Sequence, residues 1–153
     1  MELKPEPVDL SAMAARIVSD LKVTDKERSV RVRIQEGVVL RADRKLLRSV
    51  MENLIGNAWK YSAGKEQSSI CFGCGDGVCY VSDNGEGFDM ALADRLFKPF
   101  QRLHQGDTFA GHGLGLALVQ RVIERLGGRV WASGKPGEGA TFYFTVPEDD
   151  EEQ

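Results

Sequence analysis

The sequence predicts an α+β fold, a two-layer sandwich in which one mixed, mostly antiparallel sheet carries three main helices on one face. Apolar residues recur at helical spacing in three segments, and six other segments read as short strands. The strands come mainly as hairpin-like pairs, without a regular alternation of strand and helix. This order favours an antiparallel sheet over a doubly wound parallel one.

The three helices are predicted from apolar stripes and from the residues that bound them. The first begins at Asp9, a residue type favoured at the N-cap, and continues to about residue 21. The second covers residues 43–61, with one broad apolar face. The third covers residues 115–126 and stops at a Gly-Gly pair, and a short helical turn is expected at residues 91–97.

The strands are predicted as three neighbouring pairs. Residues 30–34 alternate valine or isoleucine with arginine, and we expect them to pair with residues 38–42 through a turn at Glu36 and Gly37. A hairpin of residues 68–73 and 78–82 turns at residues 75–77. The last pair is residues 129–133 and 140–146. Residues 101–113 lack a period and are expected to form a functional loop.

Length and composition indicate one globular domain. The chain has 153 residues, of which 42% are hydrophobic and 28% charged, with a net charge of −3. We assign residues 1–8 to a linker, 9–147 to the domain and 148–153 to an acidic, disordered tail. Without the tail the domain is nearly neutral, which argues against nucleic-acid binding. No run of residues has the length and hydropathy of a membrane span, so we expect no membrane contact by this domain.

The three cysteines, Cys71, Cys74 and Cys79, lie close together in the sequence. Their odd number and the lack of a secretory signal predict reduced thiols in a cytoplasmic protein. A structural zinc site needs four ligands, and no fourth ligand lies nearby. We therefore expect the cysteines to act as small apolar residues of a hairpin.

Glycines gather in three places, which suggests close approach of the backbone to a ligand. They are residues 85 and 87, residues 111, 113 and 115, and residues 137 and 139. The middle group leads directly into the third helix, whose N-terminal N–H groups suit a phosphate. It is not a Rossmann fingerprint, because no strand precedes it. Gly134-Lys135 is not a Walker A motif, because Pro136 stands where Ser or Thr is required.

Polar side chains lie along one strip of the second helix. Asn53, Asn57 and Lys60 are spaced four and three residues apart, so they project from the same side. An amide oxygen can bind magnesium that nucleotide phosphates already hold, and a lysine can neutralise a terminal phosphate. A solvated polar helix face is the alternative.

Asp83 follows a hydrophobic strand and precedes Gly85 and Gly87. A carboxylate at the end of a buried strand can accept a hydrogen bond from an exocyclic amine, and the glycines leave room for a purine. The alternative is an aspartate that only caps a turn.

Taken together, these residues resemble the ATP-binding catalytic domain of sensor histidine kinases, within the Bergerat-fold superfamily that includes gyrase, Hsp90 and MutL. ENLIGNAWKYS at residues 52–62 is similar to the N box, and DNGEGF at 83–88 to the G1 box. LFKPF at 96–100 resembles the F box, GHGLGL at 111–116 the G2 box, and GEGATF at 137–142 the last glycine box. The five motifs occur in the family's order.

The resemblance implies roles for individual residues. Asp83 would receive the adenine amine, Asn57 would ligate Mg²⁺, and Thr141 would lie near the adenine. Asn53 and Lys60 would be the catalytic pair. The expected nucleotide contacts are Asn53, Asn57, Lys60, Tyr61, Asp83, Gly85, Gly87, Phe97, Arg102, Gly111, His112, Gly113, Leu114, Gly115, Leu116 and Thr141. Residues 97–113 would form a lid over the ATP.

Asn53 separates phosphoryl transfer from hydrolysis. Relatives that hydrolyse ATP typically carry glutamate at the matching position, and a neutral amide cannot take a proton from water. Glu52 is rotated about 100° around the helix and is a poor substitute. The site is therefore expected to hold ATP for another nucleophile.

The resemblance also implies partners. A histidine kinase phosphorylates a histidine on a separate dimerisation domain, and neither His104 nor His112 is followed by an acid. We therefore expect the catalytic domain of a cytoplasmic bacterial sensor kinase, a monomer that does not autophosphorylate alone and whose full protein serves a response regulator. One alternative is a free-standing serine kinase of the anti-sigma-factor type. The other is a non-catalytic nucleotide-binding module.

Overall fold

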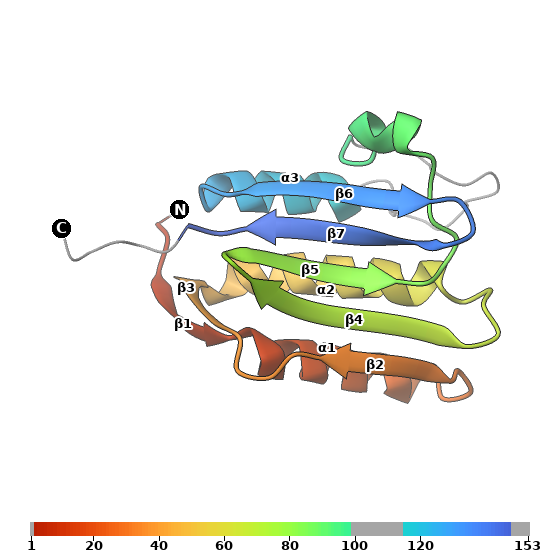
Figure 1. The fold of residues 1–153 in the computed structure, drawn as a ribbon. Coiled ribbons are helices and arrows are strands. Elements are labelled where there is room, and N and C mark those ends of the chain that lie inside the picture. The colour runs from red at the N-terminus through yellow and green to blue at the C-terminus, as the bar shows by residue number, and fades with distance from the viewer. Residues whose placement is uncertain (1, 99–114, 148–153) are drawn as a thin grey trace.

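The computed structural model describes residues 2–98 and 115–147, and within them it has the predicted α+β architecture (Figure 1). The helices are α1 (Leu10–Thr24), α2 (Arg44–Tyr61) and α3 (Gly115–Arg125), with a 3-10 helix η1 (Met90–Arg95). The strands are β1 (Pro5–Asp9), β2 (Val30–Ile34), β3 (Val39–Asp43), β4 (Ser68–Gly75), β5 (Val78–Asp83), β6 (Arg129–Lys135) and β7 (Gly139–Thr145).

The main sheet has five strands in the order β2-β4-β5-β7-β6. The β2–β4 pair is parallel and the other three pairs are antiparallel, so the sheet is mixed and mostly antiparallel as predicted. Helices α1, α2 and α3 lie on one face of it, and among the described residues no helix covers the other face (Figure 1). The core lies between the sheet and these helices, and Leu54, Ile70 and Phe144 are among its fully buried residues.

Two aspartates begin the first two helices, as predicted for α1. The Asp9 carboxylate accepts the Ala12 N–H at 2.9 Å, and Asp43 accepts the Leu46 N–H at 3.2 Å. The apolar stripe of α2 faces the sheet, and every residue of it is buried: Leu47, Val50, Met51, Leu54, Ile55 and Ala58. Capping and periodicity therefore fix this helix locally, and packing holds it against the sheet.

The N-terminal segment differs from the predicted linker. We assigned residues 1–8 to a linker, but Pro5–Asp9 forms β1 and pairs antiparallel with β3. Val8 is completely buried, so its insertion into the core stabilises the strand. The pairing lies in a separate two-stranded sheet, whose edge position tolerates the prolines.

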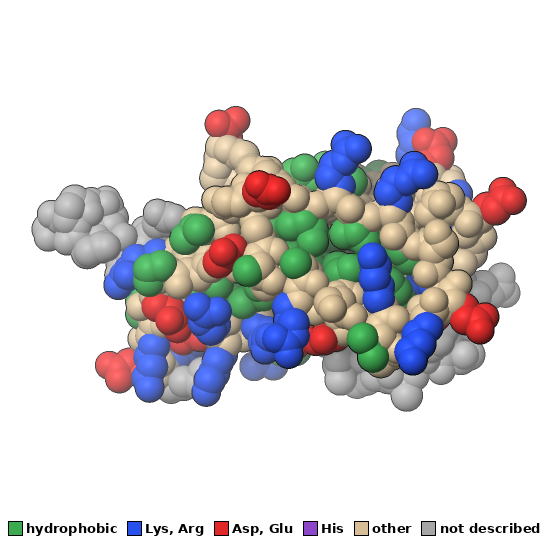
Figure 2. Space-filling view, turned by 90° about the horizontal axis from the view of Figure 1, so that it is seen from below, with side chains coloured by type: hydrophobic (Ala, Val, Ile, Leu, Met, Phe, Trp, Pro, Cys, Tyr) green, Lys and Arg blue, Asp and Glu red, His purple; other side chains and the backbone are tan. Residues whose placement is uncertain are grey.

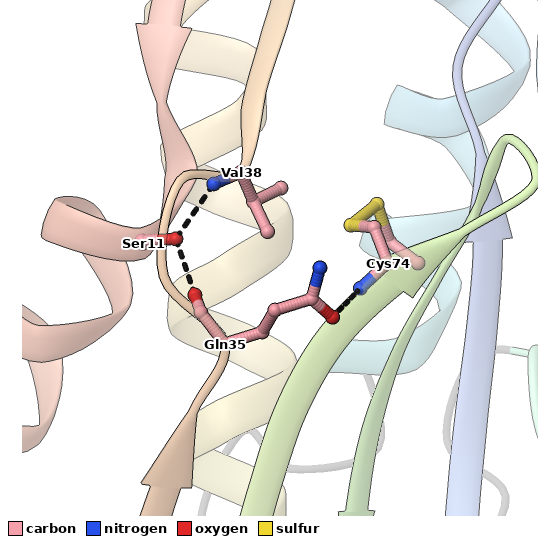
Figure 3. The surroundings of a disulfide bond; sticks show 5 residues. Ser11, Gln35, Val38 and Cys74 are labelled. Carbon is pink, nitrogen blue, oxygen red and sulfur yellow. Dashed lines mark hydrogen bonds between the residues drawn. A yellow bond between two sulfur atoms is a disulfide. The ribbon is translucent and has the colours of Figure 1, made fainter.

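The predicted pairing of residues 30–34 with 38–42 is also wrong. β2 joins the main sheet beside β4, whereas β3 joins β1. The Ser11 hydroxyl donates to the Gln35 carbonyl and accepts the Val38 N–H, so α1 holds the turn between the two strands (Figure 3). The Gln35 side chain accepts the Cys74 N–H at 3.1 Å and keeps the end of β2 at β4. The chain therefore leaves one sheet and enters another across this turn.

The cysteines differ from the prediction of three reduced thiols. Cys74 and Cys79 form a disulfide across the β4–β5 hairpin (Figure 3). They are directly opposed in the strand register, with a Cα–Cα distance of 3.9 Å, so the hairpin itself brings the two sulfurs together. Cys71 has a free thiol. The two turn residues, Asp76 and Gly77, both have positive φ, as a tight hairpin turn requires.

The surface has mixed charge on the face seen in Figure 2. Lys and Arg side chains are spread along this face, with Asp and Glu side chains between them. Among the helices of residues 2–98 and 115–147, none has the length and apolar character needed to span a bilayer. The predicted loop at 101–113 and the predicted acidic tail at 148–153 both lie outside the described residues, which end at Pro147.

Candidate nucleotide-binding site

Asp83 lies at the last position of β5 on the face of the sheet that meets the helices. Its register partners are Ile70 on β4 and Ala140 on β7, and Ile70 is buried in the core. Burial raises the pKa of the Asp83 carboxyl to about 6, and the N–H groups of Gly85 and Ala140 oppose this shift. The Gly85 N–H donates to the carboxylate at 2.7 Å. Asp83 is thus a partly desolvated acceptor beside the end of α2.

The loop after Asp83 packs directly on backbone atoms. A Cβ on Gly85 would lie 2.2 Å from the Tyr61 carbonyl oxygen, so only glycine fits there. Gly87 has φ of +67°, and a Cβ on it would lie 1.9 Å from the Lys135 carbonyl oxygen. The Glu86 N–H donates to the Tyr61 carbonyl at 3.1 Å and ties the loop to the last residue of α2. Both glycines are therefore required by close approach.

The polar strip of α2 leads from the middle of the helix to this loop. Asn53 donates its side-chain N–H to the Ser49 carbonyl at 2.7 Å. The Lys60 ammonium lies 4.2 Å from the centroid of the Tyr61 ring, in the last turn of α2. Asn57 lies between them and is half-buried, and no described residue forms a hydrogen bond with its side chain. The strip therefore places Asn57 and Lys60 in the last two turns of α2, at the helix end whose Tyr61 carbonyl accepts a hydrogen bond from the loop after Asp83.

The start of α3 lies against the same strip. A Cβ on Gly115 would lie 3.0 Å from Oδ1 of Asn53, so Gly115 of the predicted G2 box lies against Asn53 of the N box. Leu116 and Phe97 pack against the core, and the Phe97 ring contacts Phe142 edge-on with centroids 6.2 Å apart. Five other predicted contacts lie outside the described residues: Arg102, Gly111, His112, Gly113 and Leu114.

Thr141 is not brought to this side of the sheet. It pairs with Ser82, and its hydroxyl donates to the Ser82 hydroxyl at 3.0 Å. Successive strand residues point to opposite faces, so Thr141 lies on the helix-free face while Asp83 lies on the other. Ala140 is the register partner of Asp83. Ala140, and not Thr141, is therefore the β7 residue whose N–H contacts the Asp83 carboxylate. The place of Thr141 near the adenine stays a prediction.

The side chains of the candidate site offer few ligands for a metal ion. Within residues 2–98 and 115–147, no three His, Cys, Asp or Glu side chains are grouped so that they could hold an ion by themselves. The half-buried Asn57 amide offers one neutral oxygen, which fits Mg²⁺ only if other ligands come with the nucleotide. The residues therefore fit an ion that nucleotide phosphates carry in.

Curated relatives of this chain are sensor kinases and phytochromes. Over 142 residues the chain is 34% identical to phytochrome-like protein Cph1 of Synechocystis sp.. The aligned region covers 91% of this chain and 19% of that protein. It is 34% identical over 150 residues to the adaptive-response sensory kinase SasA of Parasynechococcus marenigrum, covering 94% of this chain and 39% of the kinase. The chain thus spans between about a fifth and two fifths of these relatives.

Solved structures share the fold. The mycobacterial sensor histidine kinase MprB superposes with a TM-score of 0.77 at 21% identity, covering 94% of this chain and 98% of that one. Full-length ShkA in complex with AMPPNP superposes with a TM-score of 0.74 at 26% identity, covering 97% of this chain and 33% of that one. Residues 42–150 match the model of one family, and the chain therefore belongs to the histidine kinase-, DNA gyrase B-, and HSP90-like ATPase family.

Proposed function

We propose that this chain is the ATP-binding catalytic domain of a two-component sensor histidine kinase, which transfers the γ-phosphate of ATP to a histidine on a separate dimerisation domain. The observation that carries the proposal is the position of Asp83, a half-buried carboxylate at the end of β5 that the Gly85–Gly87 loop joins to the last turn of α2. The relatives named above are sensor kinases and phytochromes, which favours a histidine acceptor over the serine of an anti-sigma-factor partner.

The side chains have complementary roles in this proposal. Asp83 accepts the adenine amine, and the glycines of its loop admit the purine. Lys60 neutralises the terminal phosphate, with Arg102 and the ion adding positive charge. Asn57 would hold Mg²⁺ together with the phosphates, and the ion would supply positive charge that lowers the repulsion met by an incoming nucleophile. Asn53 cannot act as a base toward water, so ATP waits for the histidine.

The proposal includes the setting of the domain. The acceptor histidine lies on a dimerisation domain that is normally part of the same polypeptide, and a response regulator receives the phosphate next. The domain by itself is a monomer in the cytoplasm of a bacterium. Light scattering checks the oligomeric state, and a stable dimer would contradict it.

Phosphotransfer tests the function directly. The chain is incubated with ATP radiolabelled in the γ-phosphate and with either a donor dimerisation domain or an anti-anti-sigma protein. We expect acid-labile, base-stable label on the dimerisation domain and none on the chain alone. Label on the serine partner only would support the serine-kinase alternative. ATP binding without transfer to either would favour the non-catalytic module.

A further inference from the structure

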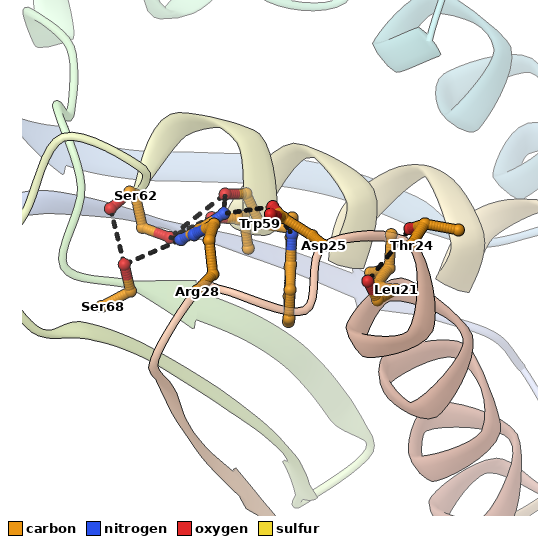
Figure 4. Close-up of polar contacts among 8 residues, drawn as sticks. Leu21, Thr24, Asp25, Arg28, Trp59, Ser62 and Ser68 are labelled. Atoms are coloured by element: carbon orange, nitrogen blue, oxygen red, sulfur yellow. Dashed lines mark hydrogen bonds and ion pairs between the residues drawn. The ribbon is translucent and has the colours of Figure 1, made fainter.

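Arg28 lies between α1 and β2 and reaches the last turn of α2 (Figure 4). Its Nη1 donates to the Trp59 carbonyl at 2.5 Å, and its Nη2 donates to the Ser68 hydroxyl at 2.7 Å and the Ser62 hydroxyl at 3.3 Å. The guanidinium carbon lies 4.9 Å from the centroid of the Trp59 ring. Only 16% of the side chain is exposed. One cation thus joins the end of α2 to the start of β4.

The groups around Arg28 at the end of α2 carry negative charge and stabilise its guanidinium. The last carbonyl groups of a helix lack partners within the helix and carry partial negative charge, so a buried cation is stabilised there. The Asp25 carboxylate lies 4.0 Å from Nη1 and also accepts the Trp59 indole N–H at 3.2 Å. The pair therefore holds both the main chain and the ring of Trp59.

The two serines extend the network and are themselves buried. Ser62 and Ser68 are 0% and 2% exposed. The Ser68 hydroxyl donates to the Ser62 carbonyl and the Ser62 hydroxyl to the Ala58 carbonyl, both at 2.7 Å. Every hydroxyl that Arg28 contacts is thus also bonded to the C-terminal segment of α2. Removing the guanidinium leaves these groups without their shared donor.

This network lies next to the residues of the candidate site. Tyr61 stands between Trp59 and Ser62, and its carbonyl accepts the Glu86 N–H and contacts Gly85. Lys60 belongs to the same turn. A shift of this turn would therefore move Lys60 and the loop that follows Asp83 together.

We propose that Arg28 is a positioning residue for nucleotide binding. It holds the last turn of α2 against the Gly85–Gly87 loop, so that the site has its binding geometry before a nucleotide arrives. This inference rests on the proposed function. Lysine cannot replace Arg28 completely, because one ammonium group cannot reach Trp59, Ser62 and Ser68 in a planar fork.

The first test compares Arg28→Ala and Arg28→Lys with a control, Arg16→Ala, which removes an arginine whose ion pair on α1 is exposed. AMP-PNP affinity is measured by calorimetry well below the Tm of each folded variant. We expect about tenfold weaker binding for Arg28→Ala, an intermediate loss for Arg28→Lys, and wild-type affinity for the control. A role limited to stability would lower Tm and leave the Kd of the folded variants within about twofold, which would overturn the proposal.

A second test needs no nucleotide. Hydrogen exchange of the Glu86 amide reports whether the loop remains bonded to Tyr61. We expect faster exchange in both Arg28 variants and unchanged exchange in the control, and equal exchange in all of them would overturn the proposal. If Arg28→Ala does not fold, Arg28→Lys carries both tests. A wild-type chain that fails to bind AMP-PNP refutes the proposed function, and the exchange result still decides the role of Arg28.

Discussion

Asp83 carries an energetic cost at the position where we propose that it binds the nucleotide. Its carboxylate is desolvated at the helix-facing end of β5, and the pKa rises to about 6 against 3.8 for the ordinary group. Between pH 4 and 6 the native state binds more protons than the unfolded state, so this group makes stability fall as pH rises through that window. Above pH 6 the Asp83 carboxylate is therefore ionised and partly desolvated, and it can accept a hydrogen bond from an amine of a ligand.

We expect Asp83→Asn to stabilise the free domain above pH 6, because the amide keeps an acceptor for the Gly85 N–H without a buried charge. The gain should be about 2 kcal/mol at pH 8 and should vanish below pH 4, where Asp83 is protonated in both states. Urea unfolding at several pH values measures it. Asp20→Asn, at an exposed position of α1, is the control. A gain that did not depend on pH would contradict the buried charge.

Gly85 is limited by space. Gly85→Ala should lower the free energy of unfolding by more than about 2 kcal/mol, because its Cβ would collide with the Tyr61 carbonyl oxygen. Gly37→Ala is the matched control: φ is +76° there but nothing lies within 4 Å, so only backbone strain of about 1 kcal/mol is expected. Thermal melts compare the two. Equal losses would mean that the close approach at Gly85 does not matter.

At the scale of elements, α2 connects stability at one end with the site at the other. Asp43 caps its start and also accepts the Lys4 N–H at 3.0 Å, and this bond lowers the pKa of the carboxyl more than any other contact. The end of the helix carries Lys60 and Tyr61 and is held by Arg28. One helix therefore has a stabilising cap at its start and residues of the proposed nucleotide site at its end.

Asp43→Ala should lower the free energy of unfolding by about 1–2 kcal/mol at pH 7, and Asp43→Asn should lose less because it still caps the helix. Because the folded pKa is depressed, the contribution is present above pH 4 and is lost as pH falls through the folded pKa. Denaturant unfolding at a series of pH values below 7 measures this. An Asp43→Ala loss that stayed constant down to the pH at which the wild-type domain unfolds in acid would contradict an electrostatic cap.

The β4–β5 hairpin is closed by the disulfide at the end opposite Asp83. Thiol titration of the unreduced, denatured chain should find one reactive thiol, from Cys71, and three after reduction. Because the loop between Cys74 and Cys79 is short, reduction should lower the free energy of unfolding by about 2 kcal/mol or less. AMP-PNP affinity should not change, and Cys71→Ser is the control for an effect of the free thiol. Three thiols before reduction would contradict the disulfide.

At the scale of the whole molecule, local signals predicted the described helices and every described strand except β1, but they did not predict every strand pairing. Periodicity predicted α1 and α2, an N-cap aspartate marked the start of α1, and hairpin turns predicted β4–β5 and β6–β7. The pairing of β1 with β3 depends on burying Val8, a long-range effect that the two prolines of the segment hide. The face of Thr141 depends on register, which a shift of one residue reverses.

The residues of the candidate site also divide into those that a local motif indicates and those that only the fold brings together. Asn53, Asp83 and Gly85 stand in motifs, so the sequence indicated them directly. Arg28 has no such signal, because in Lys26-Glu27-Arg28 it reads as part of a solvated charged turn, and only the folded chain brings it to Trp59. Position in the fold, and not local pattern, therefore identifies the residues that support the site.

The most direct test of the account is calorimetric titration of the chain with AMP-PNP, with and without Mg²⁺, beside Asp83→Ala and the exposed control Asp20→Ala. We predict saturable binding at one site that Mg²⁺ strengthens, at least about tenfold weaker in Asp83→Ala and unchanged in the control. A folded chain that does not bind, or that binds equally well without the Asp83 carboxylate, would contradict the proposed nucleotide site.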